Sequence, residues 1–350
     1  MDKIVTFGEI MLRLKPPGHE RLLQQPRLEA TFGGGEANVA VSVSLLGKQG
    51  VFVTAVPANP IGEAVITEMR RYGVETSRIQ KRPGRLGVYY VENGAMQRPS
   101  TVVYDRDYSC ISLVKPGDFD WKAIFAGDEC CGGKARWFHV TGITPAVSAG
   151  AAEAAIEAAQ TAQAAGVTVS IDLNYRKKLW NYGKKPPEVM RELTKHADVI
   201  IANEEDIQKC LGIEAKVDVT SGKLNTEVYR DLTAQVKKEF STVSVVAVTL
   251  RESKSADQNG WSGALSGKTG FYLSQRYDLD DIVDRVGGGD SFSAGLIFGL
   301  LEFPRDEQYA LNFAVAASAL KHSIPGDFNL TTRDQVEALC KGDGSGRVQR

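Results

Sequence analysis

Three consecutive glycines and an aspartate, Gly287-Gly288-Gly289-Asp290, are the residues of this 350-residue chain whose types and spacing best fit chemistry. Because glycine has no Cβ, this backbone can adopt positive φ and bring its N–H groups against a ligand. The small and apolar residues 291–301 predict a helix directly after the turn, and a helix N-terminus favours an anion. A carboxylate at the same turn can take the proton of a bound hydroxyl as that oxygen attacks phosphorus. The motif therefore suggests phosphoryl transfer.

The same residues also fit a purely structural interpretation. A flexible turn followed by an aspartate that caps a helix is common and carries no chemistry. Glycine-rich turns before helices give many false matches, so this motif alone leaves both interpretations open. The rest of the chain has to decide between them.

The elements around the turn follow an alternation of short apolar strands and helices. Expected strands cover residues 3–8, 51–56, 136–140, 167–172, 198–201 and 243–250. Expected helices cover residues 37–46, 62–72, 150–165, 306–321 and 333–341. This rhythm is typical of βαβ units, and it predicts an α/β fold: a doubly wound, mostly parallel central sheet with helices on both faces.

Two stretches interrupt the alternation. Residues 10–31 contain several prolines and no clear period, whereas residues 83–110 read as short alternating strands. Strands inserted among βαβ units suggest a small separate sheet, so we expect these two stretches to form a β-sheet lid. We predict one domain over residues 1–345 that includes this lid, and a flexible tail over residues 342–350.

Polar residues follow four of the expected strands. They are Gly8-Glu9, the run from Asp172 to Arg176, the run from Asn203 to Asp206, and the run from Thr249 to Glu252. Ligands of an open parallel sheet bind beyond the carboxyl ends of its strands, so one crevice would collect all these side chains. A chain that only needed a stable sheet would have little reason to gather Asn, Asp and Arg at one edge. This agreement favours the chemical interpretation of the glycine turn.

The composition excludes several classes of partner. The chain is 43% hydrophobic and 24% charged, as in soluble globular proteins, and its formal net charge is -1. It therefore has no basic field for nucleic acid or an anionic membrane. Five cysteines without a CxxC pair fit a reducing compartment. With no signal peptide and no apolar run of roughly 20 residues, the expected location is the cytoplasm.

Two motifs in this order resemble the ribokinase-like (phosphofructokinase-B) family of carbohydrate kinases, and the likeness covers nearly the whole chain. The first is the run from Gly33 to Ala40, and the second is the glycine turn, where Gly-Ala-Gly-Asp is usual. Glu36 replaces the commoner proline, and such a glutamate is similar to what the ketodeoxygluconate branch carries. Arg285 is unusual for the family.

The resemblance implies a role for each matching residue. Asp290 would be the catalytic base, and the anion hole would be formed by Gly287, Gly288 and Gly289. Substrate contacts would come from Gly34, Gly35, Asn38, Tyr89, Tyr104, Arg106 and Arg176. Residues near the nucleotide would be Asn203, Thr249, Arg251, Lys321, Ser323 and Asp327. Asn203 and Asp206 match the Asn-x-x-Glu motif for magnesium-bound waters, but aspartate stands where glutamate is usual, so either Glu205 or Asp206 could face the metal.

The implied reaction is transfer of the γ-phosphoryl group of ATP to the terminal hydroxyl of 2-keto-3-deoxygluconate, with Mg²⁺ and with a monovalent cation as an open third cofactor. Guanidinium groups bind carboxylates with paired hydrogen bonds, so Arg106 and Arg176 are the candidates to recognise a sugar acid. Two alternatives stay open: a kinase for fructose, ribose or a nucleoside, and a sugar-acid-binding homologue without turnover. The stereochemistry of the sugar acid is not fixed by the sequence.

The expected lid strands also suggest a partner. Val88, Tyr90 and Val102 would place apolar side chains on exposed strands, and such strands often pair with a second copy. We therefore expect a homodimer through the lid.

Overall fold

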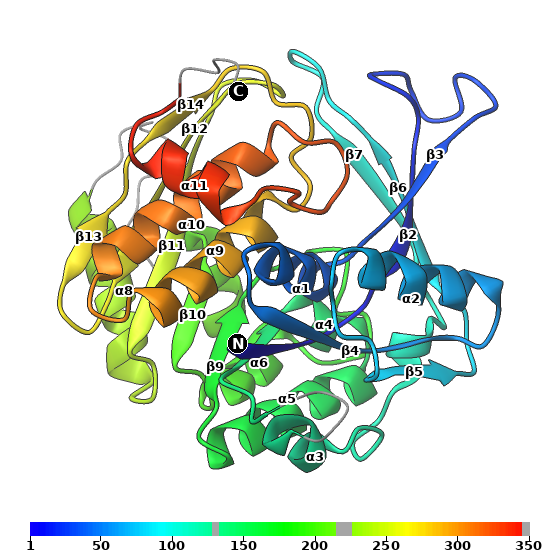
Figure 1. Cartoon of the computed structure of the whole chain (residues 1–350), viewed down its shortest axis with the longest axis horizontal. Coiled ribbons are helices and arrows are strands. Elements are labelled where there is room, and N and C mark those ends of the chain that lie inside the picture. The colour runs from blue at the N-terminus through cyan, green and yellow to red at the C-terminus, as the bar shows by residue number, and fades with distance from the viewer. Residues whose placement is uncertain (128–132, 215–225, 345–350) are drawn as a thin grey trace.

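The central sheet is large and nearly all parallel. The computed structural model describes residues 1–127, 133–214 and 226–344. Within these residues a ten-stranded sheet has the order β13-β12-β11-β10-β9-β8-β1-β4-β5, and β14 pairs with β12 (Figure 1). The strands are β1 (Lys3–Phe7), β4 (Gln49–Pro57), β5 (Ile79–Arg82), β8 (Trp137–Thr141), β9 (Thr168–Asp172), β10 (Val199–Ala202), β11 (Val245–Ser253), β12 (Asn259–Ser266), β13 (Phe271–Leu273) and β14 (Tyr277–Leu279).

Strands β5 to β11 of this order run parallel, and β12, β13 and β14 add an antiparallel edge. Every residue of β1 and β8 is buried. Such continuous burial is expected where helices cover both faces of a parallel sheet, because neither face meets water.

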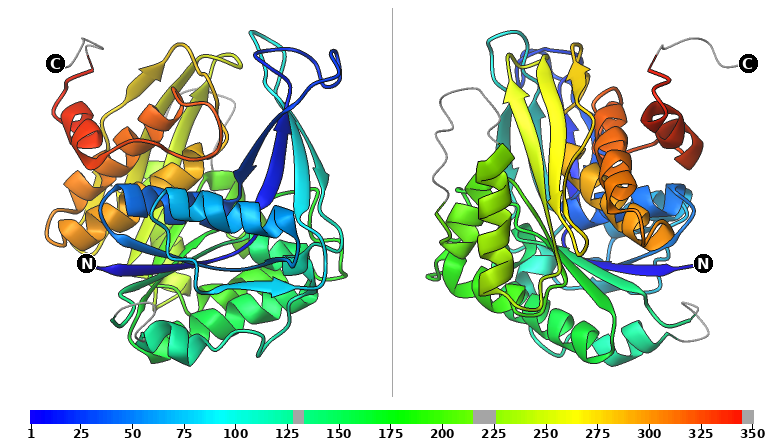
Figure 2. Two further views of the ribbon diagram at one scale, coloured as in Figure 1. Left: turned by 45° about the vertical axis from the view of Figure 1, so that its right-hand side comes forward. Right: turned by 90° about the vertical axis from the view of Figure 1, so that its left-hand side faces the viewer.

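Helices pack on the two faces of the central sheet, as the side views show (Figure 2). Successive side chains of β1 pack on opposite faces: Val5 joins the core formed with α5, and Ile4 joins the core formed with α1 and α9. This confirms the predicted doubly wound α/β class. The longer helices are α1 (Gly35–Leu45), α2 (Pro60–Arg71), α5 (Ala149–Ala164), α6 (Pro186–Thr194), α8 (Thr226–Glu239), α9 (Gly288–Glu302), α10 (Glu307–Lys321) and α11 (Arg333–Cys340). Shorter segments are α3 (Trp121–Ala126), α4 (Ile143–Val147), α7 (Glu204–Asp206), a 3₁₀ turn (Cys110–Leu113) and a π turn (Ile207–Leu211).

A second, smaller sheet projects from one end of the molecule (Figure 1). Its order is β3-β2-β6-β7, from β2 (Met11–Lys15), β3 (Glu29–Gly33), β6 (Gly87–Glu92) and β7 (Thr101–Asp105). The strands come from the two stretches that interrupt the sequence rhythm. The parallel pairing of β2 with β6 joins segments about 75 positions apart, which local sequence patterns do not reveal.

The last helix of the described residues is α11. Residues 342–344 follow that helix, and the rest of the expected flexible tail, residues 345–350, lies outside the described residues. Among the helices of the described part, none has the length and apolar character needed to cross a bilayer.

Candidate active site

A cavity of about 590 Å³ lies where the carboxyl ends of the central strands meet the small sheet. It collects residues from both sequence motifs and from all but the first of the four polar runs. The predicted site residues that line it are Gly34, Gly35, Asn38, Tyr89, Tyr104, Arg176, Asn203, Asp206, Thr249, Arg251, Gly287, Gly288, Gly289, Asp290 and Asp327. The topology thus brings together side chains more than 250 positions apart.

The glycine turn requires glycine at its first position. Gly287 precedes α9 with φ of 84°, in the left-handed region that side chains disfavour. A Cβ there would also lie 2.0 Å from the carbonyl oxygen of Asp327. The turn therefore fixes the start of α9, and the first residues of that helix line the cavity.

The unusual second glycine matches a neighbouring histidine. A Cβ on Gly288 would lie 2.8 Å from Cε1 of His322, which is buried under the turn. The alanine that is usual at this position would therefore displace the ring. Burial lowers the pKa of His322 to about 4, so the ring is neutral near pH 7.

Asp290 follows in the first turn of α9 and is held by Asn38 of α1. The side-chain amide of Asn38 donates to Oδ2 of Asp290 at 2.6 Å, and its Oδ1 accepts from the N–H of Gly34 at 3.2 Å. One buried amide therefore connects the first glycine motif with the carboxylate of the second, and it leaves the carboxyl group at the cavity wall.

The carboxyl group of Asp290 is tuned towards neutral pH. Burial raises its pKa to about 6, with a further rise from Asp327, whereas the Asn38 hydrogen bond and the charges of Arg176 and Lys321 lower it. A base is most effective when its pKa lies near the working pH, because it is then both ionised and basic. Asp290 meets this condition.

Two more carboxyl groups, those of Asp172 and Asp206, line the same cavity. Asp172 ends β9, and its Oδ2 accepts from Ser293 of α9 at 3.3 Å. Burial, followed by the charges of Asp206 and Asp290, raises the pKa of Asp172 well above its usual value. The sequence placed Asp172 at a strand end but assigned it no role, because only the fold shows that three carboxyl groups converge.

The turn after β10 distinguishes the carboxylates of Glu205 and Asp206. Both oxygens of Asp206 accept backbone N–H groups, from Tyr175 at 3.0 Å and from Asn203 at 3.2 Å. The side chain of Asn203 in turn accepts from the N–H of Asp206 at 2.8 Å. Asp206 is buried, but Glu205 is exposed and also lines the cavity. Asp206 therefore closes the turn, and Glu205 has no ion-pair partner within the described residues.

Glu36, the departure in the first motif, is fully enclosed behind the cavity. Its Oε1 accepts from the N–H and hydroxyl of Thr141 at 2.8 and 2.9 Å, and from the hydroxyl of Thr144 at 2.8 Å. Burial raises its pKa to about 7 despite these donors. Glu36 thus ties the start of α1 to the end of β8.

Three predicted residues are not brought into the cavity lining. Arg106 is buried in an ion pair with Glu9, and Ser323 is exposed on the surface. Lys321 is wholly buried, and its ammonium donates to the carbonyl oxygens of Asp284 at 3.4 Å and Ile324 at 3.0 Å. Ion pairing and burial depend on residues distant in the chain, so the position of these three residues in a motif could not predict whether they reach the cavity.

Two residues that line or support the site had no assigned role. Arg285 lines the cavity beside Arg251, and neither guanidinium has an ion-pair partner within 4.0 Å in the described part of the chain. Desolvation, followed by the charge of Arg285, lowers the pKa of Arg251 to about 10. Arg285 was recognisable in the sequence because arginine is unusual for the family at this position. Arg13 lies in a stretch without clear periodicity, so no sequence pattern indicated a role for it.

Comparison with known proteins places this geometry in context. Residues 1–331 match the model of the pfkB family carbohydrate kinases. The crystal structure of 2-dehydro-3-deoxygluconokinase from Thermotoga maritima has a TM-score of 0.89 and 44% sequence identity, covering 97% of this chain and 98% of the other. The 2-dehydro-3-deoxygalactonokinase of Haloferax volcanii is 34% identical over 98% of each chain. Fructokinase with bound ATP from Xylella fastidiosa shares the fold, with a TM-score of 0.76 and 22% identity over 98% of this chain and 99% of the other.

Both sequence motifs, the doubly wound fold and a match over nearly the full length therefore agree. The chain belongs to the pfkB family of carbohydrate kinases, which transfer a phosphoryl group from ATP to a sugar.

Proposed function

We propose that this protein phosphorylates the terminal hydroxyl of 2-keto-3-deoxygluconate at the expense of ATP. The observation that carries the proposal is the Asn38–Asp290 pair at the N-terminus of α9, in one cavity with the guanidinium of Arg176. The names of the sugar-acid kinases from Thermotoga maritima and Haloferax volcanii support the same substrate class.

Asp290 acts as the general base in this proposal. Its carboxylate takes the proton of the sugar hydroxyl as the oxygen attacks the γ-phosphorus of ATP, and the bond from that phosphorus to the bridging oxygen of ADP breaks. The backbone N–H groups at Gly288 and Gly289 stabilise the charge that develops on the phosphoryl oxygens in this proposal, and the one at Gly288 also donates to the carbonyl oxygen of Arg285 at 3.3 Å. Because these groups are fixed by the fold, they need little reorganisation during the reaction.

Arg176 is our candidate to bind the carboxylate of the sugar acid. Its side chain is exposed at the cavity, and its Nη1 donates to the carbonyl oxygen of Tyr175 at 3.0 Å. A guanidinium without a carboxylate partner can make two parallel hydrogen bonds to a guest carboxylate. Arg106 stays a second candidate, but it would have to release Glu9 to serve that role.

The nucleotide would occupy the opposite part of the cavity, lined by Thr249, Arg251 and Arg285. Two neighbouring guanidinium groups repel each other until an anion lies between them, so they suit a polyphosphate. We propose that Glu205, rather than Asp206, holds the waters of Mg²⁺, because both oxygens of Asp206 accept backbone N–H groups. ATP supply inside the cell agrees with the expected cytoplasmic location.

For the monovalent cation, we infer that the chain provides its own positive charge beside the glycine turn. Backbone carbonyl oxygens are the groups that typically hold K⁺. Here the buried ammonium of Lys321 donates hydrogen bonds to the carbonyl oxygens of Asp284 and Ile324. Added K⁺ is therefore not needed at this place.

The homodimer through the lid stays part of the proposal, with a different apolar surface from the one expected. Strand pairing puts Val88, Tyr90 and Val103 on one face of the small sheet, and Val103 is 47% exposed. Val102 alternates to the other face and lines the cavity, so it is unavailable to a partner. The outward face is the one we assign to the dimer.

A coupled ATP assay tests the proposed function. The panel contains 2-keto-3-deoxygluconate, 2-keto-3-deoxygalactonate, fructose, ribose and adenosine. We expect the highest kcat/KM with one of the two sugar acids. A neutral sugar or adenosine as the best substrate would favour a different kinase of the family, and binding without ADP formation would favour a sugar-acid-binding homologue.

A further inference from the structure

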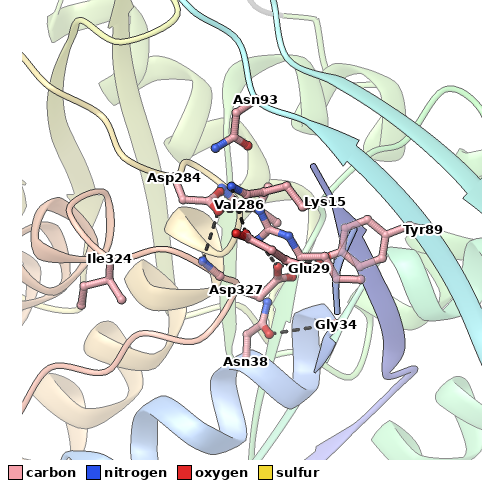
Figure 3. Close-up of polar contacts among 12 residues, drawn as sticks. Lys15, Glu29, Gly34, Asn38, Tyr89, Asn93, Asp284, Val286, Ile324 and Asp327 are labelled. Atoms are coloured by element: carbon pink, nitrogen blue, oxygen red, sulfur yellow. Dashed lines mark hydrogen bonds and ion pairs between the residues drawn. The ribbon is translucent and has the colours of Figure 1, made fainter. Parts of the chain in front are cut away.

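A buried arginine connects the lid to the catalytic turn. Arg13 lies on β2 of the small sheet, and its guanidinium bridges two aspartates of the main body. Nη2 contacts Oδ2 of Asp284 at 2.5 Å, and Nη1 contacts Oδ1 of Asp327 at 2.6 Å. The hydroxyl of Tyr89, on β6 of the same sheet, donates to that Oδ1 at 2.6 Å. Figure 3 shows Tyr89, Asp284 and Asp327 gathered above Asn38.

The two aspartates contact the backbone around the glycine turn. Oδ1 of Asp284 accepts from the N–H of Val286 at 3.2 Å, and Oδ2 accepts from the N–H of Gly326 at 3.1 Å. Val286 directly precedes the glycine turn and also packs against the inner face of the small sheet. The carbonyl oxygen of Asp327 is the atom that leaves no room for a side chain at Gly287. Asp284 is thus hydrogen-bonded to the residue before the turn, and the backbone of Asp327 lies directly against Gly287.

Charge balance requires a cation at this position. Asp284 and Asp327 are both buried, and so are Arg13 and Lys321. Burial lowers the pKa of Arg13, but the charges of Asp327 and Asp284 outweigh burial and raise the pKa above its usual value, so Arg13 keeps its positive charge. Removal of Arg13 would leave a buried carboxylate without its partner beside the catalytic base.

We propose that Arg13 is a positioning residue for phosphoryl transfer: it locks the small sheet onto Asp284 and Asp327 and thereby holds the glycine turn and Asp290 in their working geometry. The lid then contributes to catalysis through the phosphate side of the site as well as through contact with the sugar. This inference rests on the proposed kinase function for its kinetic consequence only.

Hydrogen exchange tests the connection without any substrate. We compare the wild-type protein with Arg13→Met, Arg13→Lys and the control Arg85→Met, which removes an exposed lid arginine paired with Asp105 outside this network. In Arg13→Met we expect faster exchange of peptides covering residues 283–290 and 324–328, and in Arg85→Met no change there. Equal protection of both peptides in all four proteins would overturn the proposal, whether or not the protein is a kinase.

Kinetics provide a readout that a merely structural role would not move. The groups facing Asp290 are Asn38, Asp172, Arg176, Lys321 and Asp327. With Arg13 gone, the charge of Asp327 is less compensated, so the acidic limb of the kcat profile should move up by about half a pH unit while kcat falls at least about tenfold. The double variant Arg13→Met/Asp327→Asn should return the limb to its original pH.

A conservative variant keeps the test decisive if Arg13→Met does not fold. Arg13→Lys retains the charge, but an ammonium cannot match the fork that spans both carboxylates. We expect its kcat to fall about fivefold or more with the acidic limb unchanged. A kcat within about twofold of the wild type would contradict the proposal. An absence of kinase activity in the wild-type protein would instead contradict the kinase function. Hydrogen exchange alone would then test the positioning role of Arg13.

Discussion

The side-chain amide of Asn38 donates to Asp290 at 2.6 Å while its oxygen accepts from the N–H of Gly34 at 3.2 Å. This pair of contacts orients the amide, since only one flip state satisfies both partners. It also fixes the carboxyl group of Asp290 against α1, so the two glycine motifs form one hydrogen-bonded unit. The catalytic consequences of this unit can be tested separately from those of substrate binding.

Asp290→Asn should abolish phosphoryl transfer but not binding. The amide has nearly the shape of the carboxyl group, but it cannot accept the proton of the attacking hydroxyl, so kcat should fall at least about 1,000-fold. Calorimetric titration should still detect ATP and the sugar acid, because neither depends on proton transfer. Near-normal turnover in this variant would show that another group is the base.

The rate should depend on pH through Asp290, and Asn38 should set the position of that dependence. A base with a pKa of about 6 is protonated below this pH, so kcat should decline there by about tenfold per pH unit. The Asn38 hydrogen bond lowers this pKa, so Asn38→Ala should move the acidic limb to higher pH as well as reduce kcat. An unchanged limb would mean that a different group controls it.

The fold and the centre of the site were accessible from the sequence for a physical reason. Apolar runs that are buried on both faces identify parallel strands, and the carboxyl ends of such strands must meet at one edge. This logic grouped Asp172, Asn203 and Thr249 without knowledge of strand order. All three line the cavity. Thr249 does so from within β11 rather than beyond its end, and Glu9, from the first predicted run, does not line the cavity.

The same reasoning could not predict which charged side chains form buried ion pairs with each other. Arg106 was expected to meet the substrate, but its partner Glu9 is 97 positions away and follows a different strand. Arg13 lies in the stretch with no recognisable period, because β2 is five residues long and pairs with distant strands. Local periodicity reports which residues are buried, and it does not report which buried ions face each other.

Turnover should be independent of K⁺. The ammonium of Lys321 already donates to the carbonyl oxygens of Asp284 and Ile324, so these two oxygens already have a cationic partner. Rates measured in potassium chloride, sodium chloride and tetramethylammonium chloride at equal ionic strength should agree within about twofold, because general screening is then constant. A rate that rises steeply and saturates with K⁺ alone would contradict this account.

The outward face of the small sheet should mediate dimerisation. Val103→Glu places a charge among Val88 and Tyr90 on that face without reaching the cavity. A charge in an apolar interface is costly to bury, so the variant should be monomeric and still fold. Size-exclusion chromatography with light scattering should show about twice the chain mass for the wild type and the chain mass for the variant. A monomeric wild type would remove the lid dimer from the proposal.

Recognition of the sugar carboxylate should depend on Arg176. Arg176→Met preserves the apolar stem but removes the only part of the side chain able to pair with a carboxylate, so KM for the sugar acid should rise at least about tenfold. The KM for ATP should change far less, and a slower fructose side reaction, where detectable, should be unaffected. Arg106→Met serves as the matched comparison, since it removes a guanidinium that is already paired with Glu9. If Arg106→Met raises KM for the sugar acid and Arg176→Met does not, then Arg106 must release Glu9 on binding, and the carboxylate lies nearer to β7 than we propose.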